Sequence, residues 1–211
     1  MADVFKCISV AEEGHYKEKG SAFLSYAFPL NAESEVKIHL NQLRKAHPKA
    51  RHICHAYRFG QDIHYYKASD DGEPSGTGGK PILGAIRSHE LENILIAVVR
   101  YFGGTLLGAA ALGKAYHQSA FDAIKSDNIV SVRRNVYYTL SFDFPTEKHL
   151  IPWLHKHAGI KINSAYLDKV SYTIKFPLSM EDAVETLINN AAIELQWPGK
   201  VECIKTGKDL F

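Results

Sequence analysis

The sequence has few of the features that mark secreted or membrane proteins. It contains only three cysteines, Cys7, Cys54 and Cys203, which are odd in number and far apart. This spacing argues against a disulfide framework and fits a reducing compartment. The first twenty residues carry acids where a signal peptide needs a basic end, and no apolar run is long enough to span a bilayer. We therefore expect a soluble, cytoplasmic protein with no membrane partner.

The chain also lacks a global excess of charge. It has 25 Lys and Arg against 23 Asp and Glu, a balance that does not by itself indicate nucleic-acid binding. Residues 36–61, here called the basic segment, differ because they contain four histidines, no acid and six cations: Lys37, Arg44, Lys45, Lys49, Arg51 and Arg58. With the nearby Tyr57, Tyr65 and Tyr66, this segment is either a surface that contacts phosphates and stacks bases, or a solvated helix face followed by an ordinary strand. The candidate nucleic-acid-binding residues are Arg44, Lys45, Lys49, Arg51 and Arg58.

Hydrophobic patterning along the first 130 residues predicts a mixture of strands and helices. Strands are expected at 3–10 and 21–28, joined by a polar turn, then in a hairpin at 51–60 and 63–69, and at 93–102, where the apolar run is typical of a strand buried on both faces. Helices are expected from an Asn31 cap to Pro48, from Pro81 to Glu90, and over 103–126.

The texture of the sequence changes near residue 130. The remaining elements follow a β-α-β-β-α-β order, which is the ferredoxin-like pattern. Sequence patterning therefore predicts an α+β fold with two domains, 1–130 and 131–211.

The loop at residues 68–81, "ASDDGEPSGTGGKP", places Asp70, Asp71 and Glu73 before Gly76, Gly78, Gly79 and Lys80. Carboxylates can perform acid and base chemistry or hold a hard cation, but a single loop supplies only part of a cation's ligand shell. A tight turn, in which aspartates cap backbone amides and glycines adopt positive φ, is favoured over a metal site.

Two anion sites are candidates in or near this loop. A Walker A motif is absent, because Pro74 stands at its first glycine position and Pro81 at its Ser/Thr position. The amides of the glycines with Lys80 form a looser candidate nest. The stronger candidate is the "VVRYFGGT" turn, where Arg100 precedes Gly103 and Gly104 at the expected start of a helix. Arg100 is alternatively the partner of Asp70 or Asp71 in an internal ion pair.

No catalytic residue, cofactor or metal site can be assigned. His52 and Cys54 would face one side of a strand and His55 the other, with no second cluster to complete a zinc site. Ser75 does not lie in a nucleophile elbow.

Three blocks, "RHICHAYRFG", "SDDGEPSGTGGKPIL" and "VVRYFGGTLLGAAALGKAY", resemble the YigZ/IMPACT family in their order and spacing, and the resemblance covers essentially the whole chain. It implies an N-terminal domain similar to domain 2 of ribosomal protein S5 and a C-terminal domain similar to the last domain of elongation factor G. The eukaryotic relatives regulate translation by binding a partner protein, and nucleic-acid or ribosome binding is the usual proposal for bacterial members.

The sequence departs from the family pattern at five positions. Leu106 replaces a lysine, Ala22 replaces an arginine, Ala110 and Ala111 replace glycines, and Gly78 stands where alanine is usual. These changes remove two positive side chains and the flexibility of one turn, so a phosphate-contacting role does not transfer directly to this stretch.

The expected function is a non-enzymatic, translation-associated regulator that binds RNA, the ribosome or a translation partner protein. The alternative is a metal-dependent hydrolase that acts on a phosphorylated small molecule or peptide through the acidic loop. The hydrolase requires a concave pocket lined by the loop acids and Arg100.

Overall fold

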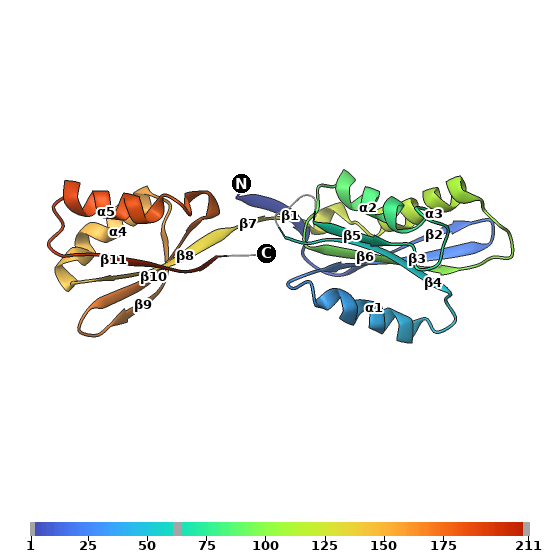
Figure 1. Cartoon of the computed structure of the whole chain (residues 1–211), viewed down its shortest axis with the longest axis horizontal. Helices are drawn as coiled ribbons and strands as arrows, with labels where there is room; N and C mark the ends of the chain where they lie inside the picture. The colour runs from blue at the N-terminus through green and yellow to red at the C-terminus, as the bar shows by residue number, and fades with distance from the viewer. Residues whose placement is uncertain (1–2, 61–64, 209–211) are drawn as a thin grey trace. The chain divides into compact units, whose positions relative to one another are not determined.

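The computed structural model describes residues 3–60 and 65–208 (Figure 1). The chain is an α+β protein and divides into two compact units, an N-terminal unit of Phe5–Val132 and a C-terminal unit built mainly from the chain from Arg133 onward. None of the helices in the described residues is long and apolar enough to cross a membrane.

The N-terminal unit is a three-layer structure around a five-stranded antiparallel sheet. Its strands have the order β2 (Glu12–Glu18), β3 (Ser21–Pro29), β6 (Ile94–Tyr101), β4 (His52–Arg58) and β5 (Tyr66–Ser69). Helix α1 (Glu35–Ala46) covers one face, and α2 (Gly79–Ser88) and α3 (Ala109–Asp122) cover the other (Figure 1). A separate two-stranded sheet joins β1 (Val4–Ile8) to β7 (Ile129–Arg133), which follows the short 3₁₀ helix η1 (Ser126–Asn128).

Burial on both faces explains the apolar sequence of the central strand. Residues 94–100 of β6 are all buried, because one set of side chains packs under α2 and α3 and the other under α1. The prediction of a doubly covered strand is confirmed. The pairing of β4 with β5, His55 opposite Ser69 through Arg58 opposite Tyr66, also agrees with the expected hairpin, although residues 61–64 of its connection lie outside the described residues.

Three local predictions are wrong. The residues expected to form a polar turn contain β2, an edge strand with the sequence EEGHYKE. Its exposed and less exposed residues alternate, but only Gly14 is buried, so no alternation of apolar side chains marks it as a strand. Helix α1 starts at Glu35 after Ser34, and the amide of Asn31 donates to the Glu35 carboxylate at 2.9 Å instead of capping the helix. Helix α3 begins at Ala109 and not at Gly103.

The C-terminal unit is a four-stranded antiparallel sheet covered by two helices. Its elements are β8 (Asn135–Phe142), η2 (Phe144–Thr146), α4 (Glu147–Lys156), β9 (Ile160–Tyr166), β10 (Val170–Pro177), η3 (Leu178–Met180), α5 (Val184–Glu194) and β11 (Glu202–Lys208). The strand order is β11-β8-β10-β9, with the two central strands alternating between buried and half-buried residues. Trp153 and Trp197 meet edge to face in its core, with ring centroids 6.0 Å apart.

Candidate functional site

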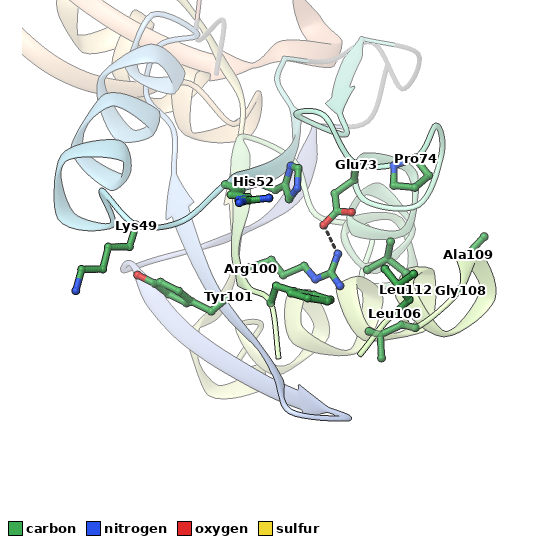
Figure 2. Close-up of a pocket in the computed structure, with 13 residues that line it drawn as sticks. Lys49, His52, Glu73, Pro74, Arg100, Tyr101, Leu106, Gly108, Ala109 and Leu112 are labelled. Carbon is green, nitrogen blue, oxygen red and sulfur yellow. Dashed lines mark hydrogen bonds and ion pairs between the residues drawn. The ribbon is translucent and has the colours of Figure 1, made fainter. Parts of the chain in front are cut away.

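A pocket of about 780 Å³ lies in the N-terminal unit where the three family-like blocks meet (Figure 2). Its walls come from residues 49–52 before and at the start of β4, from residues 73–74 of the acidic loop, from the end of β6 at 100–102, and from residues 106–112 at the start of α3. A cavity of this size is within the range of pockets that bind small ligands. The fold therefore brings together residues that are as far apart in the chain as Lys49 and Leu112.

Asp70 fixes the acidic loop to the start of α2. Its Oδ1 accepts the amides of Gly78 at 2.9 Å and Gly79 at 2.8 Å, and its Oδ2 accepts that of Gly76 at 2.8 Å. Burial pushes the pKa of Asp70 upward, but these three backbone hydrogen bonds outweigh it and leave the pKa lowered. The carboxylate thus occupies the anion position that the glycine amides would otherwise offer, so the candidate nest around these glycines is filled by the chain itself.

Asp71 ties the loop to β4 and α1. Its Oδ2 accepts the amide of Ile53 at 2.6 Å and is paired with the guanidinium of Arg44. The carbonyl of Asp71 lies 2.9 Å from Nδ1 of His52, and its backbone has φ +46°, with φ +86° at Gly72. Asp71 therefore shapes a tight turn of the kind favoured from the sequence, and Arg44 is engaged in holding it.

Glu73 is the acid that pairs with Arg100. Its Oε1 accepts Nη1 of Arg100 at 2.6 Å and the hydroxyl of Tyr116 at 2.9 Å, and only 3% of its side chain is exposed. The sequence correctly suggested an internal ion pair for Arg100 but named the wrong acids, because Asp70 and Asp71 are drawn away by backbone amides and by Arg44.

The three loop carboxylates therefore face three different sets of partners. Among the described residues, no group of three or more His, Cys, Asp and Glu side chains is arranged to hold a metal ion. Of the loop acids, only Glu73 lines the pocket. The concave pocket that the hydrolase alternative requires is present, but Asp70 and Asp71 do not line it.

Two glycines of the loop, Gly78 and Gly79, allow close packing. A Cβ on Gly78 would lie 2.4 Å from Sγ of Cys54, and a Cβ on Gly79 would lie 2.5 Å from the backbone nitrogen of Ser69. Gly76 has φ +77° and open space around it. Lys80 is exposed on α2 and does not line the pocket.

Gly103 and Gly104 do not open a helix. A Cβ on Gly103 would lie 1.9 Å from the carbonyl carbon of Gly20, so the turn between β2 and β3 requires glycine at 103. Gly104 has φ +88°. The chain then continues for several residues before α3 starts at Ala109, which places the helix N-terminus, and not the glycine pair, at the pocket.

The basic segment is only partly available at the surface. Arg58 is buried, donates to the carbonyl of Leu91 and pairs with Glu92, both at 3.3 Å, so its assignment to a nucleic-acid surface is wrong. Tyr57 is buried as well, and its hydroxyl donates to Glu33 at 2.5 Å. Lys45 is exposed on α1 and does not line the pocket.

Lys49 and Arg51 are the cations of this segment that reach the pocket. Both are exposed and line its mouth, next to the start of β4. Together with Arg100 they give three cations against the single carboxylate of Glu73 among the lining residues. The pocket is therefore electropositive as well as concave, which favours an anionic ligand.

Comparison with known proteins agrees with this organisation. The profile of the Impact N-terminal domain matches residues 19–124, which include all the pocket residues. The chain belongs to the IMPACT family. It is 32% identical to the IMPACT family member YigZ of Escherichia coli over 161 residues, which cover 75% of this chain and 79% of YigZ.

Two further similarities describe how far the family relationship extends. The IMPACT family member YvyE of Bacillus subtilis is 37% identical over 125 residues, 58% of this chain, and the matched part spans little more than half of YvyE, 57%. A solved structure described as a hypothetical protein matches 95% of this chain and 97% of its own, with 26% identity and a TM-score of 0.64. The fold of the whole chain is therefore shared with a solved structure.

The positions that depart from the family pattern fall around the pocket or its supports. Leu106 lines the pocket with 85% of its surface exposed, and Ala110 and Ala111 are the second and third residues of α3. Ala22 lies opposite Tyr101, which is a pocket residue, across β3 and β6. Gly78 leaves room for Cys54, which is why alanine does not fit there in this chain.

Sequence reasoning missed the pocket wall made by Phe102 and residues 106–109. The sequence predicted a helix from Gly103 onward, and this prediction left no loop at residues 106–108. One signal was available: Gly108, whose φ is +74°, stands directly before the first residue of α3, and glycine is one of the residues preferred at a helix N-cap.

Proposed function

We propose that the chain is a non-enzymatic, translation-associated protein of the cytoplasm that binds RNA at the electropositive pocket. The observation that carries this proposal is the meeting of exposed Lys49 and Arg51 with Arg100 at a concave surface, where the loop acids Asp70 and Asp71 are occupied by other partners. Phosphates of an RNA strand match this charge, and the aromatic side chain of Phe102, 56% exposed, is available for stacking on a base.

The proposed domain types support the same function. In the C-terminal unit, numbering the strands in chain order gives 4-1-3-2 across the sheet, and two helices connect them in the β-α-β-β-α-β order, so we assign a ferredoxin-like domain at 131–211. We assign the N-terminal domain, residues 1–130, to the type of domain 2 of ribosomal protein S5 from the family resemblance. Both domain types come from proteins that work on the ribosome.

Co-sedimentation tests the proposal. The purified chain is centrifuged with ribosomes and with bulk RNA, before and after nuclease treatment, at low and at physiological salt. We expect binding to both that weakens as salt is added and is lost after nuclease treatment. Binding to ribosomes that survives complete nuclease treatment would assign a translation partner protein instead, and no binding at low salt would overturn the proposal.

A further inference from the structure

We infer that the pocket binds a single phosphate monoester carried on a planar apolar body, which is the chemistry of a nucleoside monophosphate or of the phosphorylated end of an RNA. The inference rests on the proposed function, since it assigns a specific ligand group to the same site.

The N-terminus of α3 supplies backbone donors. The helix has 14 residues, so its dipole is well developed, and its N-cap Gly108 and first residue Ala109 line the pocket. The first intrahelical bond of the turn is from the amide of Leu112 to the carbonyl of Gly108, and no side chain caps the preceding amides. Amides at an uncapped helix start bind phosphate groups in many proteins.

Arg100 provides the second, independent feature. Only 9% of its side chain is exposed, and its Nε is buried without a hydrogen-bond partner among the described residues. Figure 2 shows its guanidinium between Glu73 and the side chains of Leu106 and Leu112, in the middle of the pocket residues. The guanidinium lines the pocket, so an anion bound there would receive charge-assisted hydrogen bonds from it.

The negative charge of Glu73 does not prevent this site from binding an anion. Its Oε1 already receives Nη1 of Arg100 and the hydroxyl of Tyr116, so it fixes the guanidinium in place. Lys49 and Arg51 at the mouth add two positive charges, and neither side chain is in an ion pair within the described part of the chain. The balance favours a doubly charged phosphate monoester, because its charge matches the two cations at the mouth.

The remaining wall is apolar and partly aromatic. It consists of Pro74, Phe102, Leu106, Leu107 and Leu112. The ring of Phe102 lies 5.6 Å from the guanidinium carbon of Arg100, and 56% of its surface is exposed. A phosphate alone would leave this wall uncovered, whereas a nucleobase attached to the phosphate would stack on Phe102 and cover the leucines.

Calorimetric titration of the full chain with AMP, adenosine and inorganic phosphate tests the inference. We expect AMP to bind at least tenfold more tightly than either adenosine or inorganic phosphate, because only AMP uses both parts of the pocket. Equal affinity for AMP and adenosine, or no AMP binding at millimolar concentration, would overturn it.

Two matched substitutions at Ala109 separate charge from shape. Ala109→Asp places a carboxylate among the α3 amides and should weaken AMP at least tenfold, while Ala109→Asn, of the same size but neutral, should weaken it less than threefold. An acid in the first helical turn stabilises a helix, so the melting temperature of the Asp variant should not fall. Equal AMP affinity in the two variants would contradict the phosphate position.

Oligonucleotides identify the source of the phosphate and separate this inference from the proposed function. A short RNA with a 5′-phosphate that binds more tightly than AMP, and more tightly than the same RNA with a 5′-hydroxyl, assigns the RNA end; AMP that binds as tightly as the phosphorylated RNA assigns a free nucleotide. AMP binding without any RNA binding would support the phosphate site and overturn the proposed RNA function. RNA binding without AMP binding would support the proposed RNA function and overturn the phosphate site.

Discussion

Nη1 of Arg100 donates to Oε1 of Glu73 at 2.6 Å, and 9% and 3% of the two side chains are exposed. This pair joins the end of the central strand to the acidic loop and so holds two walls of the pocket together. The acidic loop and the segment at the end of β6 are separate blocks in the sequence. The ion pair makes them parts of one structure.

Replacing Glu73 with glutamine should destabilise the fold by about 3–5 kcal/mol, because the Arg100 charge would remain buried without its counter-ion. Urea unfolding measures this change. Glu90→Gln is the matched control: Glu90 also forms an ion pair, with Lys6, but its side chain is 75% exposed, so its loss should have a much smaller effect on stability. Equal losses in the two variants would show that burial of the Arg100–Glu73 pair has no special effect.

Gly78→Ala should destabilise the fold by about 1–3 kcal/mol, because the new Cβ would lie 2.4 Å from Sγ of Cys54. The double variant with Cys54→Ala should recover part of the loss. Gly84→Ala is the control within the same helix, where the Cβ meets nothing closer than His117 at 3.6 Å, and it should stabilise the fold by about 0.5–1 kcal/mol. A Gly78 variant as stable as the Gly84 variant would refute the close contact.

The ionised carboxylate of Glu33 should stabilise the fold at neutral pH and lose this effect in acid. Hydrogen bonds from Tyr57 and Tyr65 lower its pKa to about 2 from 4.5. The ionised group therefore stabilises the folded state above pH 4.5, and this contribution is lost as the pH falls toward 2. Thermal unfolding of Glu33→Gln should show a lower melting temperature than the parent chain at pH 7 and a smaller difference at pH 2.5. A difference that stays constant over this range would argue against the role of the carboxylate.

Arg58→Ala should affect stability and not RNA binding. Its guanidinium is buried against the carbonyl of Leu91 and the carboxylate of Glu92, so its removal should cost about 2–4 kcal/mol. The RNA affinity of the fraction that remains folded, measured at low temperature, should equal that of the parent chain. Reduced RNA affinity in that folded fraction would show that Arg58 contributes to RNA binding.

The sequence predicts local features of this protein better than its long-range contacts. The doubly buried strand at 94–101 is readable because its composition reflects burial directly. The strand β2 is not, since a solvent-facing edge strand rich in Glu and Lys has the composition of a turn, and Gly14 within it is required by close packing on Ala123, where a Cβ would lie 2.4 Å from the backbone nitrogen.

The candidate site illustrates the same limit. Arg58 and Arg51 are equivalent in a sequence pattern of cations, but one lies inside the fold and the other at its surface. The choice of Glu73 over Asp70 and Asp71 as the partner of Arg100 depends on which backbone amides reach each acid. These are properties of the assembled loop, and no spacing along the chain encodes them.

The salt dependence of RNA affinity in a Lys49→Ala/Arg51→Ala variant tests the central claim most directly. Fluorescence anisotropy with a labelled single-stranded RNA should give a slope of log affinity against log salt that is smaller by about 1.4 than in the parent chain, since each lost phosphate contact removes about 0.7. The variant Lys45→Ala/Lys80→Ala, which removes two exposed cations outside the pocket, should keep the parent slope. Identical slopes in the parent chain and both variants would contradict RNA binding at this pocket.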